Sequence, residues 1–177
     1  DIHGPNVPKM LSLDGVEPVM KDEKTILPVI YNNNFRVMSI GFFTREAVIW
    51  RGPLKHKLIK QFIEEVEWGN LDYLVVDFPP GTGDEAISIC QLLTDITGSI
   101  IVSTPTSVAL LDAGKAVSFS NQLKIPIIGI VENMSGDVFG KRNVKEFAKE
   151  KSLPFLGSLE LHKTVTQSGA VSYTHLR

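Results

Sequence analysis

The sequence has one cysteine, no marked excess of either charge and no long apolar run. Cys90 alone excludes an internal disulfide, a Cys-pair zinc site and a four-cysteine cluster built within one chain. With 18 Lys and Arg against 20 Asp and Glu, the net charge of −2 argues against a general attraction to nucleic acid or to anionic membranes. No run approaches the roughly 18–20 apolar residues that cross a bilayer. We therefore expect a cytoplasmic protein, in a reducing compartment, with neither membrane nor nucleic acid as a partner.

The composition that remains is that of one globular domain. Apolar residues make up 43% and charged residues 21% of the 177, which is ordinary for a packed protein. The first eight residues are predicted to form a loop. Short β-prone runs follow at 27–31 and 35–42 around a turn of three asparagines, with another at 47–50.

From residue 53 onward, the hydrophobic pattern alternates between helix and strand. Strands without polar alternation that are separated by helices predict an α/β fold, a mostly parallel sheet with helices on both faces. The helices are predicted at 53–69, 85–93, 107–122 and 141–151, and the strands at 72–77, 99–103, 125–131 and 155–159. Ligands of such sheets bind beyond the carboxyl ends of the strands, where Asp77, Thr104 and Asn133 are placed.

The most specific motif is VVDFPPGTGD, residues 75–84. An apolar strand that ends in a carboxylate has the Walker B arrangement, which places Asp77 to hold Mg²⁺ directly or through water. The alternative is that Asp77 only caps a turn. Because Pro79 and Pro80 stiffen the loop and Gly81 lets backbone approach a ligand closely, we favour the functional interpretation for this loop, including Thr82.

The chain resembles the Mrp/ApbC family of P-loop ATPases, within the MinD/ParA-type class that has a deviant Walker A motif. The resemblance rests on DIHGPNVPKML (1–11), VMSIGF (37–42), AVIWRGP (47–53), DYLVVDFPPGTGDEAIS (72–88), IVSTPTSVALLDAGKAV (101–117), GIVENMSG (129–136) and PFLGSL (154–159). It implies a P-loop NTPase-like domain that hydrolyses ATP with Mg²⁺. It also implies a homodimer that serves iron–sulfur cluster assembly and transfer to apo client proteins.

The resemblance also implies roles for individual residues. Asp1 matches the switch I aspartate, which positions Mg²⁺ and the attacking water. Asn133 matches the residue that reads adenine, although a turn-forming Asn is the alternative, and Leu159 and Glu160 fall in the loop beside the base. Asp112 matches a carboxylate that contacts the lysine of the phosphate loop, with a helix-surface Asp as the alternative.

Two family features are missing from the 177 residues. A GKGGVGKS/T phosphate loop is absent, so we expect the chain as given to bind ATP poorly and residues 1–170 to form an ATPase domain without its first strand and that loop. The Cys-x-x-Cys pair that follows Glu-Asn-Met-Ser in the family is also absent. We expect Cys90 to be a helix residue rather than a cluster ligand, and residues 171–177 to be a non-native tail.

Two further hypotheses remain open. A positioning ATPase of the MinD/ParA type would bind membrane, DNA or partner proteins, but the Trp-Arg-Gly-Pro and Glu-Asn-Met-Ser segments and the lack of a basic amphipathic tail argue against it. A non-catalytic interaction module is the interpretation that applies if Asp1 is the true start. For Arg51, in the Trp-Arg-Gly-Pro segment, the sequence pattern predicts no chemical role.

Overall fold

The computed structural model describes residue 1 and residues 5–43, 52–78, 83–136 and 144–162. The chain forms two compact units, of which unit 1 includes Asp1–Leu93 and unit 2 is Thr94–Thr166. The predicted strand at 47–50 and residues 171–177 lie outside the described residues. No helix among the described residues is both long enough and apolar enough to cross a bilayer.

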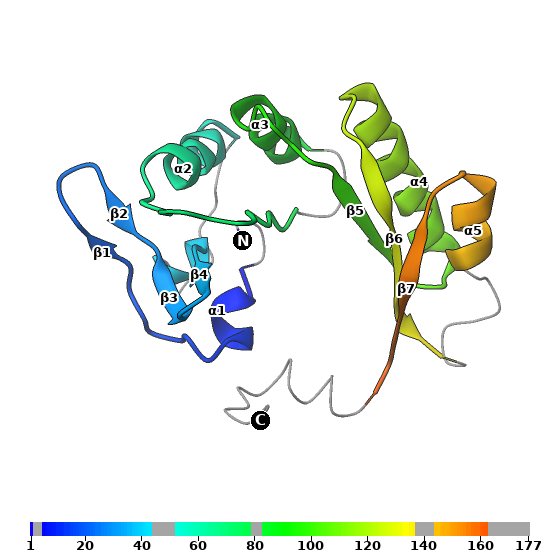
Figure 1. Cartoon of the computed structure of the whole chain (residues 1–177), viewed down its shortest axis with the longest axis horizontal. Coiled ribbons are helices and arrows are strands. Elements are labelled where there is room, and N and C mark those ends of the chain that lie inside the picture. The colour runs from blue at the N-terminus through cyan, green and yellow to red at the C-terminus, as the bar shows by residue number, and fades with distance from the viewer. Residues whose placement is uncertain (2–4, 44–51, 79–82, 137–143, 163–177) are drawn as a thin grey trace. The chain divides into compact units, whose positions relative to one another are not determined.

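Unit 2 is a three-stranded parallel sheet that carries two helices. Its elements alternate along the chain as predicted: β5 (Ser99–Ser103), α4 (Ser107–Gln122), β6 (Ile127–Ser135), α5 (Val144–Glu150) and β7 (Phe155–Glu160). The strands lie in the order β5-β6-β7, with α4 and α5 against one face (Figure 1). This arrangement confirms the α/β class and the parallel sheet. The prediction placed helices on both faces, whereas both helices of unit 2 lie on one face.

The core of unit 2 lies between this sheet and its two helices. Ile130 of β6 and Val144 of α5 are fully buried there, and Ile101 of β5 packs against them. Since successive strand residues point to opposite faces, Ile100 and Val102 lie on the other face of β5, where they are 55% and 60% exposed.

Unit 1 combines two small antiparallel hairpins with helices. The first pairs β1 (Val19–Met20) with β2 (Ile26–Leu27), and the second pairs β3 (Val29–Asn32) with β4 (Phe35–Val37). The predicted asparagine turn joins β3 to β4, where the Asn32 side chain accepts a hydrogen bond from the Asn34 main-chain N–H at 2.9 Å. The 3-10 helix η1 (Ile40–Phe42) follows β4.

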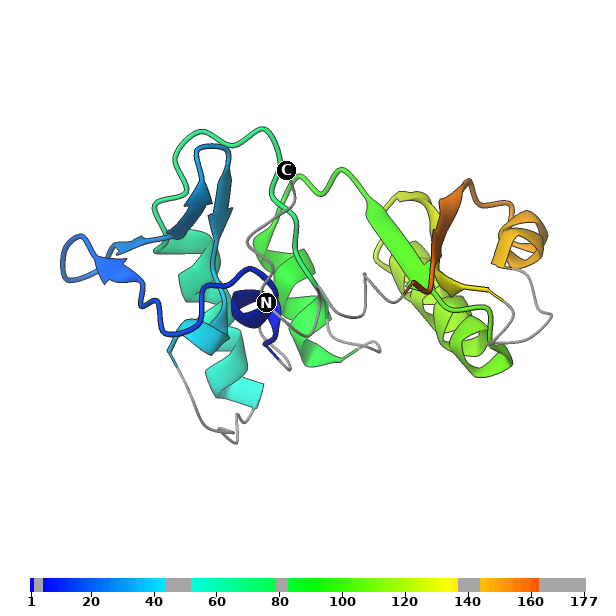
Figure 2. The ribbon, with the colours of Figure 1, turned by 90° about the horizontal axis from the view of Figure 1, so that it is seen from below.

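The helices of unit 1 are α1 (Val7–Met10), α2 (Gly52–Glu64) and α3 (Asp84–Leu92). Figure 2 shows α2 and α3 side by side, and His56 Nδ1 of α2 lies 2.9 Å from Ser88 Oγ of α3. Two apolar clusters hold the unit together. One contains Ile26, Met38, Phe62 and Val66, and the other contains Val29, Val37 and Phe42.

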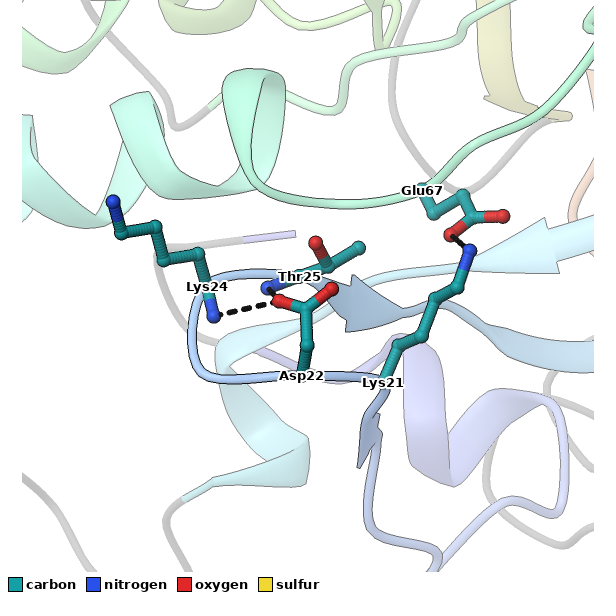
Figure 3. Close-up of polar contacts among 5 residues, drawn as sticks. All are labelled: Lys21, Asp22, Lys24, Thr25 and Glu67. Carbon is teal, nitrogen blue, oxygen red and sulfur yellow. Dashed lines mark hydrogen bonds and ion pairs between the residues drawn. The ribbon is translucent and has the colours of Figure 1, made fainter.

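The β1–β2 hairpin, which the sequence analysis did not predict, is closed by polar contacts (Figure 3). Asp22 Oδ1 accepts hydrogen bonds from the main-chain N–H groups of Lys24, at 2.9 Å, and Thr25, at 2.8 Å. Lys21 forms a 2.5 Å ion pair with Glu67, which belongs to the segment after α2. The turn bonds close the hairpin itself, and the exposed ion pair adds to the main-chain bonds by which Ile26 of β2 joins residues 65 and 67.

Several predicted boundaries are corrected by the structure. The helix predicted over 53–69 ends at Glu64, because Val66 then forms a parallel bridge with Ile26. The strand predicted over 125–131 begins after Pro126, which has no N–H to donate, and continues to Ser135. Within the segment predicted to be a loop, residues 7–10 form α1, with Pro8 in its first turn where no N–H is needed.

Candidate functional site

The carboxylate of Asp1 is held by two hydrogen bonds to the same oxygen. Oδ2 accepts from the main-chain N–H of Val7, the first residue of α1, at 3.0 Å and from Ser39 Oγ at 3.0 Å. The Asp1 carbonyl accepts from the Ile40 N–H at 2.9 Å. These bonds fix both the main chain and the side chain of Asp1 against η1 and the start of α1.

Asp77 lies in the same unit, in irregular structure. Burial lowers the pKa of the Asp1 α-amino group, and the negative charge of Asp77 acts in the opposite direction. Asp1 and Asp77, the two predicted magnesium residues, both belong to unit 1.

The strand predicted over residues 72–77 is wrong. Residues 73–78 have no regular secondary structure, and Val75 is 87% exposed. A strand exists only where a neighbouring backbone pairs with it, and none of the described residues forms a ladder with this segment. The apolar run therefore indicates a segment suited to burial, but Asp77 does not stand at the end of a paired strand in this structure.

Three predicted residues of the Walker B loop, Pro79, Gly81 and Thr82, lie outside the described residues, and so does Arg51. Gly83, which follows them, is the residue before the first turn of α3 and has an extended backbone, with φ −76° and ψ 177°. The first residue of α3 is Asp84, so the predicted order of loop and then helix is confirmed at this boundary.

The predicted base-binding residues of unit 2 meet at the carboxyl ends of two strands. Asn133 of β6 stands beside Leu159 of β7 in the parallel register, and Ser135 stands beside Glu160. Leu159 is 60% exposed, whereas Asn133 is half-buried. An apolar side chain next to an amide that both donates and accepts is suited to a heteroaromatic base.

The backbone at this end of β6 adopts an uncommon conformation. Asn133 Oδ1 accepts a hydrogen bond from the Met134 N–H at 3.0 Å. Met134 has a φ of 56°, a backbone angle that residues other than glycine adopt rarely. Glu132 Oε2 accepts from the Val144 N–H, the first of α5, at 3.1 Å. The residues on both sides of Asn133 are therefore constrained.

The ion pair that Asp112 forms is within its own helix, α4, and does not involve these strand ends. Asp112 is exposed on α4 and forms a 2.8 Å ion pair with Lys115, three residues further along the helix. This contact agrees with the alternative of a helix-surface Asp and leaves the family role as a prediction. The sequence analysis missed Ser39, because a serine inside the apolar segment VMSIGF gives no sign of a contact with Asp1.

The described residues contain no group of three or more His, Cys, Asp and Glu side chains that would hold a metal on their own. The carboxylates fit Mg²⁺, which prefers oxygen ligands and keeps several waters. Within the described part of the chain, the two bonds to Asp1 both go to Oδ2, which leaves Oδ1 for water or a cation. Cys90 is half-buried on α3, and burial raises the pKa of its thiol.

Comparison with known proteins places this chain in a family. Residues 1–175 match the ParA family described as NUBPL iron-transfer P-loop NTPase. The chain is 47% identical over 174 residues to an iron-sulfur cluster carrier protein of Methanococcus maripaludis and 45% identical to one of Methanocaldococcus jannaschii, covering 91% of this chain and 60% of each relative. The chain thus spans about 60% of the length of these curated relatives.

Among solved structures, a nucleotide-binding protein of Archaeoglobus fulgidus in complex with ADP is similar, with a TM-score of 0.77 and 28% identity over 94% of this chain and 69% of that one. The fold is that of an α/β P-loop nucleotide-binding protein. The chain belongs to the ParA/NUBPL family of iron-transfer P-loop NTPases, which confirms the Mrp/ApbC resemblance.

Proposed function

We propose that the chain is the nucleotide-hydrolysing part of an iron–sulfur cluster carrier, which uses Mg²⁺ and ATP to drive cluster assembly or transfer to apo client proteins. The observation that carries the proposal is the Asp1 carboxylate, held through one oxygen at 3.0 Å by two donors, in a chain of a P-loop NTPase family. A carboxylate that is fixed through one oxygen can direct its other oxygen at an attacking water.

Each predicted residue has a part in this proposal. Asp1 accepts a hydrogen bond from the attacking water, which orients the lone pair of that water toward the γ-phosphorus, and Asp77 would hold Mg²⁺ through water. Asn133 hydrogen-bonds the adenine edge beside Leu159 and Glu160. Residues 79–82 approach the phosphates, and Asp112 contacts the lysine of a phosphate loop. When bound, Mg²⁺ supplies neutralisation of the phosphate charge.

The cluster is the cargo of this reaction. A [4Fe–4S] cluster takes four thiolates, whereas two copies of these 177 residues supply one each from Cys90. The proposal therefore assigns this chain the ATP-dependent step in a homodimer and does not assign it the cluster ligands. Anaerobic reconstitution with iron and sulfide should leave no stable cluster absorbance on the 177-residue chain, and a cluster that survives Cys90→Ala would contradict this assignment.

The test of hydrolysis compares the 177-residue chain with one extended upstream by the family's glycine-rich phosphate loop. We expect only the extended chain to bind and hydrolyse Mg-ATP, and Asp77→Ala in it to abolish turnover. Lys60→Ala, which removes an exposed ion pair with Glu64 on α2, is the matched control and should leave turnover unchanged. An extended chain without turnover would refute the proposal and favour the non-catalytic module.

A further inference from the structure

Ser39 is a fully buried polar residue that the proposed reaction does not use directly. It lies between β4 and η1 with 0% of its surface exposed. Its Oγ is 3.0 Å from Asp1 Oδ2 and accepts a hydrogen bond from the Gly41 main-chain N–H, also at 3.0 Å. Ser39 therefore connects the N-terminal turn of η1 to the carboxylate of Asp1.

The chemistry of the three groups fixes the direction of the bond to Asp1. A main-chain N–H only donates and an ionised carboxylate only accepts. Since Gly41 donates to Oγ, the single hydroxyl proton of Ser39 is directed at Asp1 Oδ2. Together with the Val7 N–H on the same oxygen, this bond determines where the other carboxylate oxygen of Asp1 points.

The surroundings of Ser39 leave little room for another arrangement. A Cβ placed on Gly41 would lie 3.2 Å from Ser39 Oγ, 3.2 Å from Pro8 Cγ and 3.3 Å from Pro5 Cβ. The hydroxyl is thus enclosed by the start of α1 on one side and by η1 on the other. Every buried side-chain nitrogen and oxygen atom among the described residues has a partner, so removal of this hydroxyl would remove a donor that Asp1 uses.

We propose that Ser39 is a positioning residue for ATP hydrolysis, which acts by holding Asp1 Oδ2 so that Oδ1 faces the attacking water. This inference rests on the proposed function, because it assigns Asp1 the same role. Without the Ser39 bond, the Asp1 side chain keeps one donor and gains freedom to rotate about it. Misplacement of a catalytic group by about 1 Å costs up to about a hundredfold in rate, with substrate binding much less affected.

The experiment measures kcat and KM for Mg-ATP in the chain extended by the phosphate loop. Ser39→Ala should lower kcat about tenfold or more and change KM less than about threefold. Ser39→Cys fills the same space with a weak donor, so it should also lose turnover if the hydrogen bond, and not the shape, matters. Ser120→Ala is the matched control, since Ser120 is 5% exposed and pairs with the Ser99 hydroxyl in unit 2; it should keep wild-type kcat.

A double substitution separates an effect through Asp1 from a general loss of structure. In an Asp1→Ala background, Ser39→Ala should lower kcat no further, because the group through which Ser39 acts is gone. A further tenfold loss in that background would overturn the inference, and so would full kcat in both single Ser39 variants. In either case a hydrolysing parent chain leaves the proposed function intact, whereas a parent without turnover refutes the function and this inference with it.

Discussion

Gly129, the third residue of β6, is expected to tolerate no side chain. Its backbone is ordinary for a strand, so the constraint is space. A Cβ there would lie 2.6 Å from the Pro154 carbonyl oxygen and 2.6 Å from Leu156 Cγ, whereas ordinary contact begins at 3.4 Å. The Pro154 oxygen accepts the Ile130 N–H at 2.9 Å in the β6–β7 ladder, so it is backbone that is already engaged.

Gly129→Ala must therefore separate the start of β7 from β6. Overpacking of this kind costs about 1–3 kcal/mol. The midpoint of the loss, about 2 kcal/mol, corresponds to roughly thirtyfold in the unfolding equilibrium, since about 1.4 kcal/mol is tenfold. With a urea dependence of about 2 kcal/mol per molar, unfolding of unit 2 should move down by about 1 M urea.

The assay must monitor unit 2 itself. Both tryptophans, Trp50 and Trp68, precede residue 94, so their fluorescence monitors unit 1. Native-state hydrogen exchange of the Ile130 amide, which is bonded across the affected pair of strands, monitors unit 2. We expect its exchange to accelerate in Gly129→Ala by the factor that the free-energy loss implies.

Gly114→Ala is the matched control. Gly114 lies inside α4, where an added Cβ would meet only Phe147 Cζ at 4.0 Å. Alanine is favoured over glycine in a helix by about 0.5–1 kcal/mol, so this variant should slow the same exchange. Unchanged Ile130 exchange in Gly129→Ala, or a comparable acceleration in Gly114→Ala, would refute the argument from close approach of the strands.

Three further predictions concern unit 1. Because burial raises the pKa of the Cys90 thiol, iodoacetamide should label it more slowly at pH 8 than it labels a free cysteine peptide, as mass spectrometry would measure; equal rates would contradict this. Hydrogen bonds from main-chain N–H groups lower the pKa of Asp22. The stability that these bonds contribute is therefore present above the ordinary pKa of an aspartate and is lost as the pH falls through the lowered pKa of the folded state. Asp22→Ala should speed hydrogen exchange of the Thr25 amide at neutral pH, and an unchanged rate would contradict this. Trp68→Phe removes the 2.9 Å bond from Nε1 to the Phe62 carbonyl and should cost about 1 kcal/mol in urea unfolding of unit 1, whereas no change would show that water replaces the bond.

The sequence predicts best the elements that local signals define. β5 and α4 begin and end at the predicted residues, because Thr106 caps α4 by accepting the Ala109 N–H at 3.2 Å and the apolar periods on either side are clear. In unit 2, a short apolar run, a capping residue and an amphipathic helix agree with one another. Such agreement lets sequence alone place Asn133 at a strand end.

Elements that depend on distant partners are predicted poorly. Strands β1 and β2 are two residues each, and β2 is held by the exchange of main-chain bonds between Ile26 and residues 65 and 67, at 2.8 and 2.9 Å. Residues 72–77 carry a strong strand pattern but have no partner among the described residues. Ser39 belongs to the same class, since its role depends on Asp1, 38 residues away in sequence.

The hydrogen bond between Glu132 and the Val144 N–H has an evolutionary consequence. It joins β6 to α5 on either side of residues 137–143, the part of the sequence in which the resembling family carries its cysteine pair. The join is made by residues outside this stretch, and doubling a loop's length costs only about 0.6 kcal/mol. A family member with a different length or composition there is therefore expected to keep the strand that presents Asn133, provided that it keeps this bond.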